Sequence, residues 1–173
     1  MLEKYISSLS SKEQKLLQPT PEVISAEIFS EDIKKDIANL CESLRSNGLR
    51  IKWVMKNSWE VAYKKVQILR RIRINPEEKN WYVTLHFFPQ YNDYITDEEI
   101  HNFVWNNLGG TGCDALKNAD VANCGHNLSF NIFGKICEKQ CCNSQIKIVN
   151  PTAKALEHTK TLILTAWDIT KVN

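Results

Sequence analysis

The chain has 173 residues, of which 43% are hydrophobic and 24% are charged, a composition typical of one globular domain rather than a disordered segment. Its 22 basic and 20 acidic residues leave a net charge of +2, which argues against a nucleic-acid or membrane-surface partner. The first residues lack the apolar core of a signal peptide, and no run approaches the roughly 18 apolar residues of a membrane span. We therefore expect a cytoplasmic protein with a single domain over residues 1–173.

Residues 1–29 are expected to form an N-terminal arm that contains one short helix. Ser10 and Glu13 have the spacing of a capping box, in which each side chain caps the backbone N–H of the other residue. Pro19 and Pro21 are expected to end this helix, because proline disrupts helical backbone hydrogen bonding. The segment 23–29 is too short and too mixed in character for a prediction.

A second helix is predicted over residues 31–47, with Ser30 as its N-cap and Gly48 as its end. Apolar residues recur there at helical spacing and predict one buried face, made of Ile33, Ile37, Leu40, Cys41 and Leu44. Because Cys41 lies on that face, we expect a buried structural cysteine that reacts slowly with thiol reagents.

Alternation of apolar and polar residues replaces helical spacing after Gly48 and predicts strands up to residue 88. The expected strands cover residues 49–56, 59–63, 66–74 and 81–88, and the short connections between them favour antiparallel pairing. Residues 59–73 contain good helix formers and neither glycine nor proline, so one continuous helix there is the competing interpretation.

The second half of the chain is expected to place strands between two helices. The predicted elements are, in order, a helix capped by Thr96 and ended by Gly109, a loop over 109–127, strands over 128–133 and 144–149, and a helix over 151–167 capped by Asn150. Together with the first half, this order predicts an α+β fold with a mostly antiparallel sheet and helices packed on one face. Lysines and arginines are expected on the open face of that sheet.

Five of the six cysteines lie between residues 113 and 142, in a cysteine-rich loop region that we place over residues 109–143. Zinc prefers four tetrahedral Cys or His ligands, and the candidate ligands are Cys113, Cys124, Cys137 and Cys141, with Cys142 and His126 as substitutes. The chain lacks the paired C-x-x-C that marks many zinc sites, so ordinary free thiols are an equal alternative. A thiol-based redox role for Cys137, Cys141 or Cys142 is also open.

Aromatic and basic side chains in the strand region supply further candidates. A curved sheet that presents Trp53, Trp59 and Tyr63 can line a pocket for a flat organic ligand, although such rings also fill the space between sheet and helices. The strand region also has five basic residues, Lys64, Lys65, Arg70, Arg71 and Arg73. They either contact phosphate groups of a ligand or are simply solvated on the outer face of the sheet. The sequence has no phosphate-binding loop, no dinucleotide fingerprint and no H-E-x-x-H pair.

Two resemblances accompany these patterns. The series Gly112-Cys113, Cys124-Gly125, Gly134-Lys135, Cys137 and Ile148-Val149-Asn150-Pro151, followed by a helix, resembles uncharacterised cysteine-containing small proteins of anaerobic Firmicutes. That resemblance implies no activity. The earlier helix, followed by Trp53, Tyr63 and a β-meander, is similar to the YdhG-like proteins, whose fold is similar to frataxin. Those proteins lack this cysteine loop, so an iron-chaperone role is not carried over.

The sequence as a whole favours binding over catalysis. Our leading hypothesis is a small binding module of unknown ligand whose cysteine-rich loop holds a structural zinc or another soft metal. The alternative is a thiol-based redox enzyme or sensor, and the third hypothesis is a partner-binding domain whose cysteines are incidental. The expected partner is a small molecule or a protein, and not a membrane.

Overall fold

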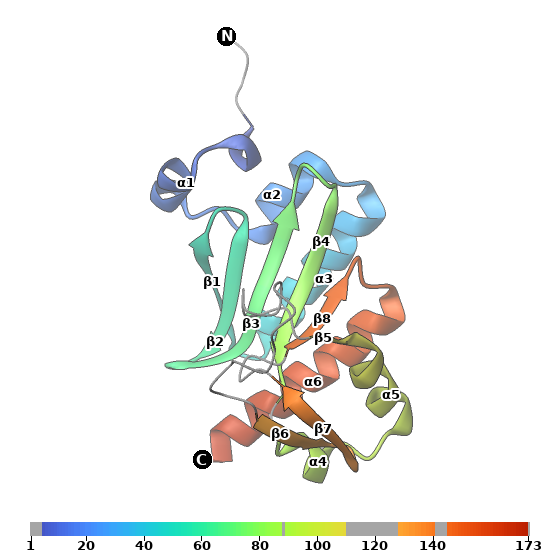
Figure 1. Ribbon diagram of the computed structural model, residues 1–173. Coiled ribbons are helices and arrows are strands. Elements are labelled where there is room, and N and C mark those ends of the chain that lie inside the picture. Colours follow the sequence, from blue (N-terminus) through green and yellow to red (C-terminus); the bar gives the residue numbers. More distant parts are fainter. Residues whose placement is uncertain (1–4, 88, 110–127, 141–144, 173) are drawn as a thin grey trace.

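Helical and extended segments form separate groups along the chain, and the computed structural model arranges them as an α+β fold (Figure 1). It describes residues 5–87, 89–109, 128–140 and 145–172, with only the backbone described at residues 109, 128–130, 137–140 and 145. No helix in these described ranges is long and apolar enough to cross a membrane.

The main sheet is antiparallel throughout and has the strand order β1-β2-β3-β4-β8-β5. Its strands are β1 (Arg50–Met55), β2 (Ser58–Tyr63), β3 (Val66–Asn75), β4 (Asn80–His86), β5 (Leu108–Gly109) and β8 (Gln145–Val149). The meander predicted after Gly48 is therefore confirmed. The competing helix over residues 59–73 is excluded, because those residues form β2, β3 and the turn between them.

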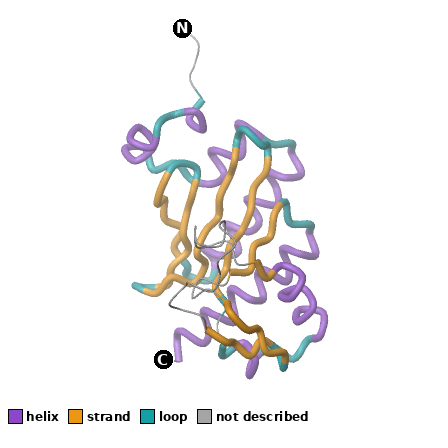
Figure 2. The backbone as a smooth tube through the Cα atoms, in the orientation of Figure 1, coloured by secondary structure: helices purple, strands orange, loops and turns teal. Residues whose placement is uncertain are grey.

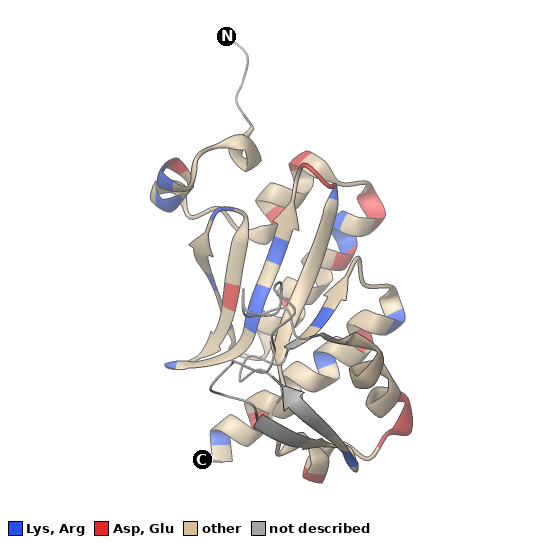
Figure 3. Ribbon diagram, viewed as in Figure 1, with Lys and Arg blue, Asp and Glu red and all other residues tan. Residues whose placement is uncertain are grey.

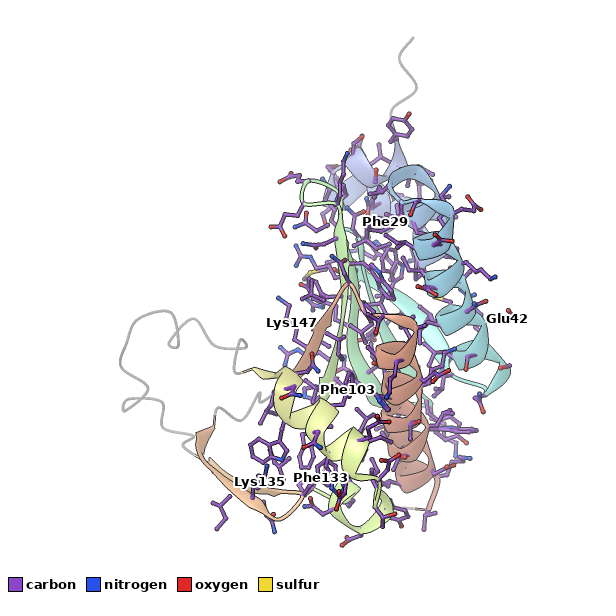
Figure 4. All side chains as sticks on the ribbon, turned by 90° about the vertical axis from the view of Figure 1, so that its right-hand side faces the viewer. Phe29, Glu42, Phe103, Phe133, Lys135 and Lys147 are labelled. Atoms are coloured by element: carbon purple, nitrogen blue, oxygen red, sulfur yellow. The ribbon has the colours of Figure 1, made fainter. Side chains whose placement is uncertain are left out.

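Helices cover one face of this sheet, as Figure 2 shows by the separation of helical and extended backbone. The helical elements are η1 (Ile6–Ser8), α1 (Ser11–Leu17), α2 (Pro21–Ile28), α3 (Glu31–Ser46), α4 (Tyr91–Tyr94), α5 (Glu98–Asn107) and α6 (Ala153–Val172). Elements α2, α3 and α6 pack directly against the first strands of the sheet. In Figure 4, Glu42 marks the outer side of α3, and Lys147 marks the opposite side of the molecule, beyond the sheet.

The core lies between the sheet and these helices. Four residues of the predicted α3 stripe, Ile37, Leu40, Cys41 and Leu44, are at most 1% exposed, whereas Ile33 is half-buried. The sheet contributes fully buried side chains at alternate positions, among them Trp59, Val61, Ile72, Ile74, Trp81, Val83, Ile146 and Ile148. This alternation leaves the other face of each strand to polar residues.

The N-terminal arm contains a second α-helix, α2, and the short 3-10 helix η1, neither of which the sequence analysis predicts. The capping box of Ser10 and Glu13 is confirmed, with both hydrogen bonds present. Pro21 lies beyond the end of α1, as predicted, but it is also the first residue of α2. A proline is accommodated there because the first backbone N–H groups of a helix have no intrahelical partner.

The prediction for α5 needs two corrections. Its N-cap is Asp97 rather than Thr96, and the Asp97 side chain accepts a hydrogen bond from the backbone N–H of Glu99 at 2.8 Å. The helix also ends at Asn107, before Gly109, because residues 108 and 109 pair with β8 as the short strand β5. The one-turn helix α4 was not predicted.

Residues 128–140 form a hairpin of β6 (Leu128–Ile132) and β7 (Lys135–Gln140), where one strand had been expected. Gly134 and Phe133 both have positive φ, +78° and +47°, and make the turn between the two strands. Cys137 therefore belongs to strand β7, opposite Phe130, and not to a loop.

The last helix begins later and ends later than predicted. Asn150 does not cap it, because that residue has φ +44° and its side-chain oxygen accepts the N–H of Trp81 at 3.0 Å. The hydroxyl of Thr152 instead accepts from the N–H of Ala155 at the start of α6. The helix continues beyond the predicted residue 167 to Val172.

Candidate functional site

An open pocket with a volume of about 800 Å³ lies along β1, which is the edge strand of the main sheet. Its lining consists of residues 18–21, Arg45, residues 49–53, Trp59, Glu60, Ala62, Lys64 and Lys65. Successive residues of a strand point to opposite faces of a sheet. A pocket that is lined by five consecutive residues, 49–53, therefore reaches both faces of β1, and it continues onto β2 through Trp59, Glu60 and Ala62.

One wall of this pocket is the connection between α1 and α2, which a buried amide holds against the turn from β1 to β2. The Gln14 side chain is fully buried and donates to Asn57 Oδ1 at 2.7 Å and to the carbonyl of Ile6 at 2.8 Å. Its own oxygen accepts the backbone N–H of Asn57 at 2.9 Å. Because buried amide groups need partners, these bonds fix the arm on the hairpin.

Trp59 ties the same connection to the sheet. Its indole N–H donates to the carbonyl of Pro19 at 2.6 Å, and its side chain is 1% exposed. Trp53 lies opposite Trp59 on the neighbouring strand and is only half-buried. Trp53 is therefore the aromatic side chain of the lining that retains surface for a ligand.

Among the described residues, the lining carries five basic side chains and one acidic side chain. Lys52 is 71% exposed and lies 3.8 Å from the carboxylate of Glu60, which also accepts from Gln67 at 3.0 Å. Lys65 has no hydrogen-bond or ion-pair partner in the described part of the chain. Figure 3 shows this positive charge at the turn between β2 and β3. The rim of the pocket is therefore suited to negative charge.

Arg45 is hydrogen-bonded to a carboxylate, since both of its terminal nitrogens donate to Glu22. Burial alone would raise the pKa of Glu22, but the hydrogen bonds from Arg45 hold that pKa below its ordinary value. The nearby Cys41 thiol has a pKa raised far above its ordinary value, by burial first and then by Glu22. The Cys41 thiol thus stays protonated, and the side chain contributes to the packing of the core.

The three predicted aromatic residues have different surroundings. Trp53 and Trp59 line the pocket, although Trp59 belongs mainly to the core. Tyr63 is not among the lining residues, and its ring packs edge-on against Trp167 with centroids 6.0 Å apart. The structure therefore brings two of the three rings to one pocket.

The basic residues of the predicted phosphate strip divide between two places. Lys64 and Lys65 reach the rim of the pocket. Arg71 and Arg73 pair with Thr84 and Tyr82 of β4, away from the pocket. The next strand continues this second group, since Lys147 lies 4.5 Å from the Tyr82 ring centre, on the side of the sheet opposite α3 (Figure 4). The expected basic open face is thus present, and Arg71, Arg73 and Lys147 on it are not among the residues that line the pocket.

Most of the predicted metal ligands lie outside the described residues, namely Cys113, Cys124, His126, Cys141 and Cys142. Cys137 is placed on β7 by its backbone alone. Within the described part of the chain, no three His, Cys, Asp or Glu side chains are grouped so that they can hold a metal ion. The zinc and redox hypotheses therefore stay predictions.

The sequence analysis missed the residues that turn a strand edge into a pocket: residues 18–21, Arg45, Arg50 and Lys52. A partial signal exists, because Arg50 and Lys52 alternate with Ile51 and Trp53 along the first strand. The contribution of residues 18–21 has no such signal, since it depends on how the arm folds back over the sheet.

The chain matches no family model, and no curated protein or solved structure is significantly similar to it. The resemblances drawn from the cysteine spacing and from the meander stay predictions. The site itself is therefore the basis for a functional inference.

Proposed function

We propose that this chain is a small binding module whose pocket beside β1 takes an anionic ligand with a flat apolar group. The observation that carries the proposal is the combination, in one open pocket of about 800 Å³, of an excess of cations and a half-buried indole. Pockets of this size accommodate a small organic ligand or a short segment of another chain.

The charges and the ring have separate roles in this proposal. Arg50, Lys52, Lys64 and Lys65 attract the anionic groups, and each exposed pair contributes roughly 0.2–1 kcal/mol. Covering apolar surface of the half-buried Trp53 ring adds roughly 25 cal/mol for each Å² that is buried. Because association also costs translational and rotational freedom, we expect the weak binding of an open site.

Binding without catalysis is favoured by the lining itself. Among the described lining residues there is neither histidine nor cysteine, and the carboxylate of Glu60 is engaged by Lys52 and Gln67. That carboxylate is therefore not free to act as a general base.

A fluorescent, flat polyanion tests the proposal directly. Pyrenetetrasulfonate titrated with the full chain at low salt is expected to bind, and the affinity is expected to fall as ionic strength rises. Uncharged pyrenemethanol is the matched probe and should bind more weakly. Absence of saturable pyrenetetrasulfonate binding contradicts the proposal.

Variants then locate the site. Replacing Lys52 and Lys65 together with glutamate should weaken pyrenetetrasulfonate binding at least about tenfold, because two attractions become repulsions. Lys35→Glu is the matched control, since Lys35 is exposed and lies about 15 Å along α3 from the lining residue Arg45. Equal losses in both proteins would place the binding elsewhere.

A further inference from the structure

We infer that the ligand of this pocket is an acidic polypeptide segment that adds in extended conformation to the free edge of β1. This inference rests on the proposed function, because it names the class of anion that the pocket takes. It draws on three features of the described residues: an unpaired strand edge, alternating side-chain character along that edge, and a wall beside it.

The edge of β1 that faces away from β2 is unpaired among the described residues. Of the described strands, β1 pairs with β2 alone and lies at one end of the sheet. Within the described chain, no backbone hydrogen bond joins residues 50–54 to any segment other than β2. Alternate residues of such an edge strand present free N–H and C=O groups, which are the template for another strand.

The length of the pocket matches a short peptide. Five consecutive residues, 49–53, line it, and they span about 13 Å at roughly 3.3 Å per residue. A segment of about four or five extended residues covers that distance. A single small anion would leave much of this edge without partners.

Side chains along β1 alternate in chemical character. Arg50 and Lys52 are exposed on one face, whereas Ile51 and Trp53 are half-buried on the other. Side chains of paired residues lie on the same face of a sheet, so an added strand would place alternate residues against each group. The complementary segment therefore has acidic residues alternating with apolar residues.

Basic residues on a strand edge also occur in proteins that simply avoid aggregation. Here β1 has a wall beside it, because residues 18–21 and Arg45 line the same pocket as β1. Trp59 holds that wall through its bond to the Pro19 carbonyl. A walled groove that carries excess positive charge is a receptor for one acidic strand, rather than a bare protected edge.

The test uses a fluorescein-labelled hexapeptide, Glu-Leu-Glu-Phe-Glu-Leu, and fluorescence anisotropy with the full chain at low salt. Two N-methylated forms of this peptide serve as controls, one methylated on the first, third and fifth nitrogens and the other on the second, fourth and sixth. An added strand uses one of its edges only. One methylated form should therefore lose binding about tenfold or more, while the other binds like the parent peptide.

Charge reversal ties the peptide to this edge. Lys52→Glu should weaken binding of the acidic peptide, whereas Lys35→Glu should leave it unchanged. The peptide Lys-Leu-Lys-Phe-Lys-Leu should bind the Lys52→Glu protein better than it binds the wild type. Because Lys52 is 71% exposed, the variant is expected to fold, and its thermal unfolding is measured alongside.

Amide hydrogen exchange supplies an independent readout. The N–H groups of β1 that point away from β2 should exchange rapidly in the free protein and slowly in the complex. Equal affinity for the parent peptide and both methylated forms would overturn the inference. Binding of pyrenetetrasulfonate without any binding of the peptide would overturn it too, while leaving the proposed function intact. Failure of both probes would refute both.

Discussion

At the scale of single residues, one buried amide decides where the N-terminal arm lies. Gln14 is surrounded by partners that come from the arm itself and from the turn after β1. A short helix with exposed Leu16 and Leu17 has little apolar surface of its own to hold it in place. Hydrogen bonds from Gln14 therefore fix the arm at the turn after β1, while burial of Pro19 and Pro21 packs the pocket wall against the fold.

Replacing Gln14 with leucine should lower the free energy of unfolding by about 1–3 kcal/mol, because Asn57 would be left with buried, unpaired groups. Denaturant unfolding measures this change, and affinity for pyrenetetrasulfonate should fall as the wall loosens. Lys15→Ala on the exposed side of the same helix is the control and should stay within about 0.5 kcal/mol of the wild type. A Gln14→Leu protein of unchanged stability would show that the amide does not hold the arm.

The Glu22–Arg45 pair makes stability depend on pH in a defined direction. The folded pKa of Glu22 lies below its ordinary value, so the pair stabilises the fold above about pH 4.3, the ordinary carboxyl value. This stabilisation is lost as pH falls through the folded pKa. Both side chains are partly exposed, so the effect is on the order of 1 kcal/mol or less.

Glu22→Gln should therefore lower the unfolding midpoint in denaturant near pH 7, and the difference from wild type should shrink towards about pH 3. Glu31→Gln is the comparison, because Glu31 forms a surface ion pair with Lys34 one turn along α3. Its unfolding midpoint should differ little from that of the wild type at either pH. A difference that grows as the solution becomes more acidic would contradict the assigned pKa direction.

Cys41 should be the least reactive of the cysteines in the folded protein. Its side chain is 0% exposed, and burial raises the pKa of its thiol, so little thiolate is available. Timed alkylation followed by peptide mass spectrometry measures the order of modification. Modification of Cys41 ahead of the cysteines between 113 and 142 would show that its site opens readily.

At the scale of elements, periodicity predicted most helices and strands, and local capping chemistry decided their ends. The α3 stripe and the alternation after Gly48 are each visible in the sequence because every second or every third to fourth residue is buried. The start of α5 was misplaced because the next residue, Asp97, caps the helix, and the start of α6 was misplaced because the Asn150 side chain bonds Trp81 instead. Asn150 instead joins the end of β8 to the start of β4.

Asn150→Ala should destabilise the fold by about 1–3 kcal/mol, since it removes the acceptor for Trp81 and places alanine at positive φ. Asn150→Gly loses the same acceptor without the backbone strain, and its cost should be smaller. Denaturant unfolding of the two variants separates the two contributions. Equal stability of the alanine variant and the wild type would show that the Asn150 side chain does not stabilise the connection between β8 and β4.

At the scale of the whole molecule, the cysteine-rich region holds the prediction with the largest functional consequence. If the thiolates of Cys113, Cys124, Cys137 and Cys141 together bind zinc, protein purified without a histidine tag should contain about one zinc ion per chain. The affinity should fall as pH drops, because protons compete for the thiolates. Elemental analysis and competition with a chromogenic chelator measure both properties.

A metal-free protein that contains a thiol of low pKa would favour the redox alternative instead. Under the redox alternative, the Cys124→Ser protein should contain no metal, like the wild type. Under the zinc hypothesis, the same variant should lose most of the metal that the wild type holds. Cys41→Ser is the matched control for metal content, because Cys41 is buried in the α3 stripe within the core.

The sequence by itself determined the α+β class, the antiparallel meander and the helical faces that cover it, because each depends on a local repeat of apolar residues. Trp53 and Lys52 are visible in the sequence, but no local pattern there indicates that they line a pocket together with residues 18–21. Only the tertiary structure decided that β1 ends the sheet and that the arm folds back to wall its edge. Such a groove arises from contacts between residues some 40 positions apart, as between Trp59 and Pro19, and no local pattern encodes which segment will supply the far wall.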